Sequence, residues 1–275
     1  MDSERNGKAA PARRIALLID ADNVAHAQIA PMLAELSKHG VANIRRAYGN
    51  WASESLKNWK GRLQDHAIRP VQQFSYSAGK NATDMALVID AMELLYTQKL
   101  DAFCIASSDA DFTPLVMQLR ANGLEVYGFG ERKTPEPFVN ACSTFLYFDS
   151  LGEGAAPVET APGAKTAAPV GAKPAPATSS SAAKLPQDTK LVSVLRGAVK
   201  ATARDDGWAT LAAAGAAVNR QAPIDPRNYG VRNFSRLFQA TELFEMVKCV
   251  EDGHAYVADK RNKERSEKPR PQMNR

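Results

Sequence analysis

The stretch Ile15-Ala16-Leu17-Leu18-Ile19-Asp20-Ala21-Asp22-Asn23 decides the fold of the first half of this chain. Its first five residues form a continuous apolar run, which is typical of a buried parallel strand. Strand-like and helix-like segments alternate from there to about residue 150, and this order predicts an α/β fold with a doubly wound, mostly parallel sheet. The expected strands are Ile15–Ile19, Asn43–Tyr48, Ile68–Phe74, Phe103–Ala106, Leu124–Phe129 and Thr144–Phe148, and the expected helices are Ala27–Lys38, Ser53–Asp65, Thr83–Tyr96 and Phe112–Ala121.

Composition divides the 275 residues into two domains and a linker. Residues 152–184 are rich in Ala, Pro, Gly, Ser and Thr and have almost no large apolar side chains. Such a segment buries too little surface to offset the entropy lost on ordering, so it predicts a disordered linker. The expected parts are a flexible N-terminus (1–12), an α/β domain (13–150), the linker (151–185), a second domain (186–259) and a basic tail (260–275).

The second domain has a different order of elements. Thr189–Ala203, Leu211–Asn219 and Val231–Gln239 are expected to be helices, and Phe244–Val250 and His254–Ala258 are expected to pair as a hairpin. The Asp-Gly pair between these two strands favours a tight primed turn. Three helices followed by a hairpin predict a small winged helix-turn-helix domain.

Net charge is unevenly distributed along the chain. Residues 1–150 carry 16 basic and 17 acidic side chains, residues 186–259 carry 9 of each, and residues 260–275 carry 7 basic and 2 acidic ones, a net +5. A flexible basic tail favours a polyanionic partner. A tail that only aids solubility has the same composition, so charge alone leaves both interpretations open.

Two observations concern the cellular compartment. No stretch reaches the roughly 18 apolar residues of a membrane span, and the polar N-terminus lacks the apolar core of a signal peptide. The cysteines Cys104, Cys142 and Cys249 are scattered and lack the paired spacing of a zinc site. We therefore expect reduced thiols in a cytoplasmic protein without a membrane anchor.

Four acidic residues lie where strands end or helices begin. Asp20 follows the first strand, Asp109 and Asp111 follow Phe103–Ala106, and Asp84 begins the helix before that strand. Ligands of open parallel sheets collect outside the carboxyl ends of the strands, so we expect these carboxylates to converge. Clustered carboxylates raise one another's pKa, and a hard divalent cation such as Mg²⁺ or Mn²⁺ relieves that repulsion.

Each of these residues also has a structural interpretation. Asp109 and Asp111 could cap the following helix, Asp84 could stabilise its own helix through the helix dipole, and Asp22 with Asn23 could form an Asx turn. For any one residue alone, capping is the better interpretation. For four acids at the ends of two strands and one helix, a metal site is favoured.

Other polar residues near the acids are weaker candidates. Ser107 and Ser108 could contact a scissile phosphate, or could only cap or shape their loop. Lys80 could hold a phosphate, although a solvated lysine fits the same pattern. Asp90 lies six residues after Asp84, about 240° around the helix, so it predicts a solvated or supporting residue.

Three motifs in this order resemble the NYN domains of the LabA-like branch, over roughly residues 13–150. The motifs are Leu18-Ile19-Asp20-Ala21-Asp22-Asn23, Lys80-Asn81-Ala82-Thr83-Asp84-Met85-Ala86-Leu87 and Ile105-Ala106-Ser107-Ser108-Asp109-Ala110-Asp111-Phe112. The resemblance implies a PIN-like fold and a four-acid centre that binds Mg²⁺ or Mn²⁺ and hydrolyses RNA. The positions that match this centre are Asp20, Asp84, Asp109 and Asp111, with Asn23 as a polar helper.

Residues 186–259 resemble a LOTUS domain, also called OST-HTH. The resemblance rests on Asp225-Pro226-Arg227-Asn228-Tyr229-Gly230, Phe234-Ser235-Arg236-Leu237-Phe238 and Leu243-Phe244-Glu245. It implies a winged helix that binds RNA and in some cases other proteins. Arg227, Arg232 and Arg236 are the candidates for phosphate contact, with solvated surface arginines as the alternative.

These patterns predict a metal-dependent endoribonuclease with a C-terminal RNA-binding module. The alternative is a non-catalytic RNA-binding or regulatory adaptor whose acids hold a structural ion. A nucleotide-binding Rossmann-type enzyme is disfavoured because no glycine-rich loop follows the first strand.

Overall fold

The computed structural model describes residues 12–74, 82–151 and 182–271. The chain divides between Leu151 and Gly152 into two compact units, which we call the N-terminal unit and the C-terminal unit. The predicted flexible N-terminus, most of the predicted linker and Lys80 lie outside the described residues. No helix within these ranges is both long enough and apolar enough to span a bilayer.

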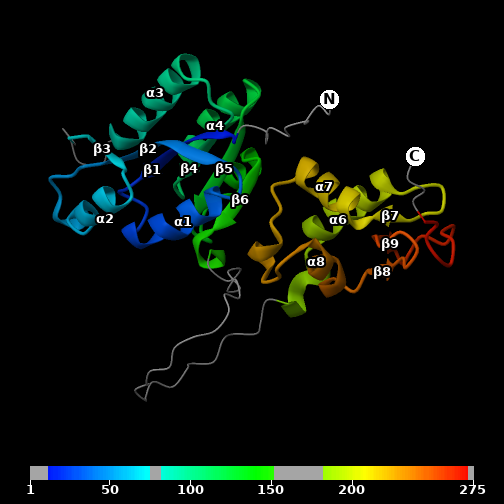
Figure 1. Cartoon of the computed structure of the whole chain (residues 1–275). Helices are drawn as coiled ribbons and strands as arrows, with labels where there is room; N and C mark the ends of the chain where they lie inside the picture. The colour runs from blue at the N-terminus through cyan, green and yellow to red at the C-terminus, as the bar shows by residue number, and fades with distance from the viewer. Residues whose placement is uncertain (1–11, 75–81, 152–181, 272–275) are drawn as a thin grey trace, which may run out of the picture. The chain divides into compact units, whose positions relative to one another are not determined.

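The N-terminal unit is built on a parallel sheet of six strands in the order β3-β2-β1-β4-β5-β6 (Figure 1). The chain adds strands outward from β1 in one direction and outward from β4 in the other, so the order reverses between β1 and β4. The predicted doubly wound sheet is therefore confirmed. The strands are β1 (Arg14–Asp20), β2 (Val41–Gly49), β3 (Arg69–Gln72), β4 (Ala102–Ala106), β5 (Glu125–Gly130) and β6 (Thr144–Tyr147).

Helices cover both faces of this sheet (Figure 1). Alternate residues of β1 explain why: Ile15, Leu17 and Ile19 belong to the core under α1 and α2, whereas Ala16 and Leu18 belong to the core under α3, α4 and α5. The short helix α5 was not expected from the sequence, because six residues are too few for a clear helical period. The helices are α1 (Ile29–Leu36), α2 (Trp59–Asp65), α3 (Ala82–Thr97), α4 (Thr113–Ala121) and α5 (Glu136–Ala141).

The reversal of strand order fixes where a ligand can approach the sheet. Ile19 of β1 pairs with Ala106 of β4, so the next residues, Asp20 and Ser107, leave the sheet side by side. In doubly wound sheets this point opens a crevice at the carboxyl ends of the two central strands. The acidic motifs that follow β1 and β4 therefore lie together, as the sequence predicts.

The C-terminal unit combines three helices with a three-stranded antiparallel sheet in the order β7-β9-β8, which confirms the predicted class. Helix α8 begins later than expected because the Asn233 side chain caps it, accepting a 3.0 Å hydrogen bond from the backbone N–H of Arg236. The two-residue strand β7 was too short to predict. The elements are α6 (Thr189–Thr202), β7 (Ala209–Thr210), α7 (Leu211–Gln221), α8 (Phe234–Ala240), β8 (Phe244–Lys248) and β9 (Ala255–Asp259), with 3₁₀ turns η5 (Ala182–Gln187) and η6 (Pro226–Tyr229).

The turn between β8 and β9 is longer than the tight primed turn expected from Asp-Gly. The backbone N–H of Cys249 donates to the His254 carbonyl at 2.9 Å, and the N–H of Gly253 donates to the Cys249 carbonyl at 3.1 Å. Four residues, 250–253, therefore lie in the connection. Gly253 does take the left-handed conformation, with φ of 72°, which explains the glycine at this position.

The described part of the basic tail packs against the C-terminal unit, which corrects the expectation of a flexible tail. The indole of Trp208 is fully buried and donates to the Ser266 carbonyl at 3.0 Å. The backbone N–H of Arg270 donates to Asp206 at 2.8 Å, and Arg204 donates to the Arg270 carbonyl at 2.7 Å. We call residues 260–271 the C-terminal strap.

Gly207 makes this close approach by the strap feasible. A Cβ atom on Gly207 would lie 2.6 Å from the Cβ atom of Arg265, and its φ of 79° disfavours other residues. The sequence hid the strap because its composition is that of a solvated tail, and its packing depends on Trp208, more than fifty residues earlier.

We expect truncation after Asp259 to destabilise the C-terminal unit by about 2 kcal/mol or more, because Trp208 loses its cover and its hydrogen-bond acceptor. Truncation after Pro271 is the matched control, since it removes only residues beyond the strap. Denaturation followed by tryptophan fluorescence and circular dichroism measures the difference. Equal stability of the two truncated chains would contradict the structural role of the strap.

Candidate functional site

Asp20 is the buried centre of the acidic site. It ends β1 and is fully buried, and its Oδ2 atom accepts hydrogen bonds from Asn23 at 2.7 Å and Ser107 at 2.8 Å. Its other oxygen, Oδ1, is buried without a hydrogen-bond partner. Burial raises the pKa of this carboxyl, opposed by the two hydrogen bonds. A buried carboxylate oxygen without a donor is costly, so this atom is available for a cation.

Asp22 and Thr83 also belong to the site, although neither was among the site residues predicted from the sequence. The Thr83 hydroxyl donates to Asp22 Oδ2 at 2.8 Å and so links the loop after β1 to the first turn of α3. This bond places Asp84, the next residue, at the crevice. The sequence gives one indication of their role: Asp22 lies two residues after Asp20, and Thr83 lies directly before Asp84.

Asp84 lies close enough to the other acids for their charges to affect it. Its pKa is raised from 3.8 to about 6, first by burial and then by the carboxylates of Asp20, Asp109, Asp111 and Asp22. Acids from three separate segments, the loop after β1, the start of α3 and the loop after β4, therefore share one electrostatic environment. The sequence predicts that these acids converge, and Asp84 lies within range of the charges of the other four.

The loop after β4 is held by its own side chains. Asp109 caps the short turn η3 (Ala110–Phe112) by accepting a 2.8 Å hydrogen bond from the N–H of Asp111, as the capping interpretation proposed. Asp111 is exposed. Ser108 accepts a 2.8 Å hydrogen bond from the N–H of Glu131, so it shapes the loop. Capping occupies one oxygen of Asp109, which leaves the other for a further ligand.

The structure corrects the role considered for Ser107. Its side chain is fully buried and its hydroxyl is bonded to Asp20, so it does not face a substrate in this geometry. Ser107 instead orients Asp20. Asp90 is likewise a supporting residue: it bonds to Arg46 and Tyr48 of β2 and fastens α3 to the sheet.

The acidic site is the candidate site for a divalent cation. Within residues 12–74, 82–151 and 182–271, no three His, Cys, Asp or Glu side chains stand close enough together to enclose one ion. Two observations fit a cation nevertheless: Asp20 Oδ1 is buried without a hydrogen-bond partner, and the pKa of Asp84 is raised by burial and then by the charges of the neighbouring carboxylates. All the candidate donors are carboxylate oxygens, the ligands that Mg²⁺ and Mn²⁺ prefer.

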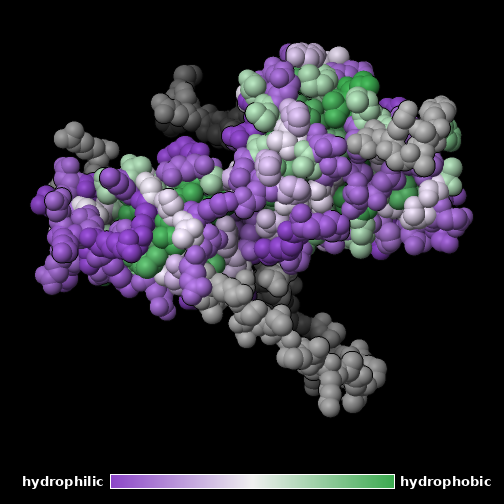
Figure 2. Space-filling model, turned by 180° about the vertical axis from the view of Figure 1, so that it is seen from behind, coloured by the Kyte–Doolittle hydropathy of each residue, from purple (hydrophilic) through white to green (hydrophobic). Residues whose placement is uncertain are grey.

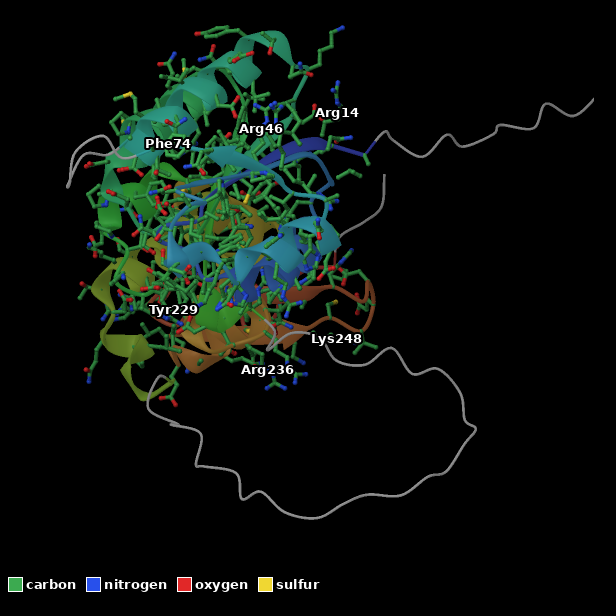
Figure 3. All side chains as sticks on the ribbon, turned by 90° about the vertical axis from the view of Figure 1, so that its left-hand side faces the viewer. Arg14, Arg46, Phe74, Tyr229, Arg236 and Lys248 are labelled. Carbon is green, nitrogen blue, oxygen red and sulfur yellow. The ribbon has the colours of Figure 1, made fainter. Side chains whose placement is uncertain are left out.

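The three candidate arginines of the C-terminal unit have different surroundings. Arg227 forms a two-point ion pair with Asp225, with distances of 2.9 and 2.8 Å, so its charge is already compensated. Arg232 and Arg236 are exposed and line a hollow of about 510 Å³ on α8, and Figure 3 shows Arg236 pointing outward. The geometry therefore supports phosphate contact for Arg232 and Arg236 and argues against it for Arg227.

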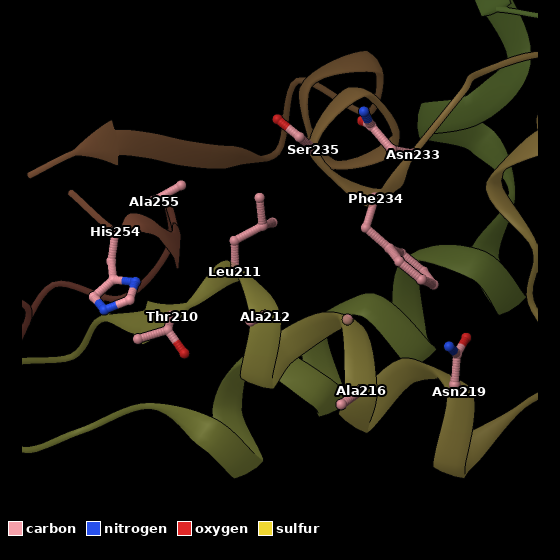
Figure 4. A pocket seen from close by; sticks show the side chains of 11 residues that line it. Thr210, Leu211, Ala212, Ala216, Asn219, Asn233, Phe234, Ser235, His254 and Ala255 are labelled. Carbon is pink, nitrogen blue, oxygen red and sulfur yellow. The ribbon is translucent and has the colours of Figure 1, made fainter. Parts of the chain in front are cut away.

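A second hollow, of about 640 Å³, lies between α7 and α8 beside the hairpin. Its floor is formed by small residues of α7, and Phe234 reaches from α8 over this floor (Figure 4). Asn219, Asn233 and His254 supply polar groups at its rim. Among the described residues, no acidic side chain lines either hollow.

Comparison with known families matches both units. Residues 14–151 match the family model described as NYN domain, which is half of the chain. The chain belongs to the NYN family. Residues 186–256 match the OST-HTH/LOTUS domain. The chain therefore has an NYN domain, which is a nuclease-type domain, followed by a LOTUS domain, which is an RNA-binding type of domain. The match to the LOTUS domain ends before the strap.

No curated protein matches the chain. Among solved structures, a protein of unknown function from Vibrio parahaemolyticus is similar, with 17% sequence identity and a TM-score of 0.44, over 51% of this chain and 95% of that one.

Because the pKa of Asp84 is raised, we expect the stability of the NYN domain to depend on pH. The folded state binds this proton more tightly than the unfolded chain, so the free energy of unfolding falls as pH rises from about 4 to 6 and stays low above that. Without divalent cation, Asp84→Asn should therefore stabilise the domain at pH 7, by on the order of 1 kcal/mol after solvent screening, and should have no such effect below pH 4.

Thermal unfolding of both chains in chelator across this pH range measures the effect. Asp65→Asn, the same change at an exposed residue of α2, is the control and should change nothing. A stabilisation by Asp84→Asn that is equally large at all pH values would show that repulsion among the carboxylates is not its cause.

Proposed function

We propose that the protein is a divalent-cation-dependent endoribonuclease that binds RNA through its LOTUS domain. The observation that carries the proposal lies at the reversal point of the sheet, where the charges of Asp20, Asp109 and Asp111 act on Asp84 and Asp20 Oδ1 is buried without a hydrogen-bond partner. The cytoplasmic location expected from the sequence belongs to the same proposal.

The residues of the site divide into ligands and supports. Asp20, Asp84, Asp109 and Asp111 would hold the cation, and Asp22 adds negative charge beside them. Asn23 and Ser107 fix the Asp20 carboxylate through one oxygen, which directs the other toward the cation. Thr83 and Asp22 hold the first turn of α3 against the loop after β1, so that Asp84 stays in place.

When bound, a divalent cation lowers the pKa of a water molecule and stabilises negative charge on the phosphate. Asp20, Asp84, Asp109 and Asp111 would hold the cation at the crevice, where it would supply this chemistry. The backbone of the loop after β4 is rigid because Asp109 and Ser108 both accept backbone hydrogen bonds. The proposed reaction is hydrolysis, in which water attacks the phosphodiester and one bridging oxygen leaves with a proton.

The C-terminal unit supplies the RNA contacts in this proposal. Arg232 and Arg236 would bind phosphates, and Phe234 would stack on a base in the hollow between α7 and α8, since stacking accepts any base. The absence of acids around both hollows, within the described residues, supports this arrangement.

The experiment is to incubate the full chain with a labelled single-stranded RNA and Mg²⁺ or Mn²⁺, in water enriched in a heavy oxygen isotope. Hydrolysis should produce new phosphate ends that carry one solvent oxygen, detected by mass spectrometry. The alternative function, a non-catalytic RNA-binding adaptor, predicts RNA that is bound but intact. Cyclic phosphate ends would point to attack by the 2′-hydroxyl and overturn the proposed chemistry.

A further inference from the structure

The outer face of α3 is apolar, although it faces solvent. Met85, Ile89 and Tyr96 are 59%, 61% and 70% exposed, and Met92 between them is half-buried. These four residues follow one another at intervals of four, three and four, which places them within about 60° of one another on a helix. Figure 2 shows apolar side chains gathered over this helix. We call Met85, Ile89, Met92 and Tyr96 the α3 stripe.

The stripe is not needed to hold the helix to its own sheet. The inward face of α3 consists of other residues, Thr83, Leu87, Ala91 and Leu94, which are buried. At 100° per residue these two sets lie on opposite sides of the helix. A solvated helix normally carries polar residues on its outer face, so an apolar stripe at heptad-like spacing indicates a helical partner.

From these features we infer that the α3 stripe is a homodimer interface, in which α3 packs antiparallel against α3 of a second copy. The intervals four, three and four read the same in both directions. A two-fold axis near the middle of the stripe therefore places Met85 opposite Tyr96 of the second copy and Ile89 opposite its Met92. Isologous contacts of this kind are the commonest form of self-association.

The charges of α3 fit this arrangement. Glu93 is the exposed acid beside the stripe, while Asp90 is paired with Arg46 and Asp84 lies in the acidic site. A parallel pair would bring Glu93 against its own copy, which repels. The antiparallel pair places Glu93 opposite Val88 instead. The stripe itself has no cation, so it does not suit RNA.

The size of the surface also fits a second copy. A stable interface needs about 800 Å² from each partner, a patch about 30 Å across. The 16 residues of α3 extend over about 24 Å, which covers most of that width. The stripe thus forms the apolar centre of such a patch.

Segments of the same chain are poorer occupants. Residues 152–181 contain only Val158 and Val170 as large apolar side chains, so they do not match a stripe of Met, Ile and Tyr. The seven residues between Phe74 and Ala82 are attached at the beginning of α3. Half of their length reaches about 12 Å at most, which is short of Tyr96, about 16 Å along the helix from Met85.

The dimer has a consequence for the acidic sites. Antiparallel pairing places the two Asp84 residues 13 positions apart along the paired helices, which is about 20 Å along their axes. One dimer then presents two acidic centres at opposite ends of one interface.

The first test is the mass of the full chain by sedimentation or light scattering over about a hundredfold range of concentration. We expect a dimer of the 29.8 kDa chain that dissociates on dilution. Ile89→Glu should raise the dimer dissociation constant about thirtyfold or more, because it buries a charge at the centre of the interface. Val250→Glu is the matched control, since Val250 is exposed but lies in the other unit, and it should leave the dimer unchanged.

Circular dichroism checks that both variants keep their fold. A chain that is monomeric at every concentration overturns the inference, and so does a dimer that survives Ile89→Glu. Neither outcome bears on the proposed nuclease activity, which the cleavage assay measures separately.

The second test examines the direction of pairing by disulfide cross-linking. In a Cys249→Ser background, whose other two cysteines are buried, Met85→Cys and Tyr96→Cys are introduced into separate chains. The antiparallel arrangement predicts a cross-linked dimer only when the two chains are mixed. Cross-linking of each variant with itself, and no cross-link between the two different chains in the mixture, would establish parallel pairing and contradict the inferred geometry.

Discussion

Asp20→Asn should lower the rate of RNA cleavage by about a thousandfold or more and leave the fold intact, because it removes the charge of the most buried carboxylate. The two side-chain hydrogen bonds to the Asp20 carboxylate, from Asn23 and Ser107, end on the same oxygen. An asparagine can place its carbonyl oxygen there and its amide group where the carboxylate oxygen has no partner. We therefore expect thermal stability in chelator to be equal or higher.

Asp65→Asn is again the matched control, an identical substitution at an exposed acid, and should keep full activity. Single-turnover rates with excess enzyme separate cleavage from RNA binding. If Asp20→Asn cleaves RNA as fast as the unmodified chain, the acidic site is not the catalytic centre.

The double variant Arg232→Ala with Arg236→Ala should bind RNA about tenfold more weakly near physiological salt. Each lost single-strand phosphate contact reduces the slope of log affinity against log salt by about 0.7, so the pair should flatten this slope by about 1.4. Fluorescence anisotropy of a labelled single-stranded RNA at several salt concentrations measures both quantities.

The control removes the same charge elsewhere in the C-terminal unit. Arg261→Ala with Lys263→Ala changes two exposed side chains of the strap. If binding is local to α8, this pair affects affinity less than the arginine pair does. Equal losses in the two double variants would mean that RNA responds only to the overall charge of the unit.

The sequence was sufficient for the sheet and for the meeting of the acids, because both follow from short-range patterns. Buried runs predict parallel strands, and the ends of adjacent parallel strands bring Asp20 and the Ser107–Asp111 loop together without any knowledge of side-chain packing. The position of Asp84 in the first turn of α3 was equally clear from the apolar period of that helix.

The roles that depend on tertiary contacts were beyond the sequence. Ser107 could be either a substrate contact or a loop residue until its burial against Asp20 was known. From the sequence, Arg227 and Arg232 were equal candidates for phosphate contact, but in the turn η6 Arg227 forms an ion pair with Asp225. The packing of the strap could not be predicted for the same reason, since the hydrogen bond from Trp208 to the Ser266 carbonyl forms only in the folded unit.

The central claim is that these carboxylates hold a divalent cation that RNA cleavage requires. The most direct measurement is the single-turnover cleavage rate of the full chain as Mn²⁺ or Mg²⁺ is titrated into chelator-treated protein. We predict a rate at background without the cation, a saturable rise as it is added, and loss of that rise in Asp20→Asn. An undiminished rate in excess chelator, with the same RNA and the same protein, would contradict the account.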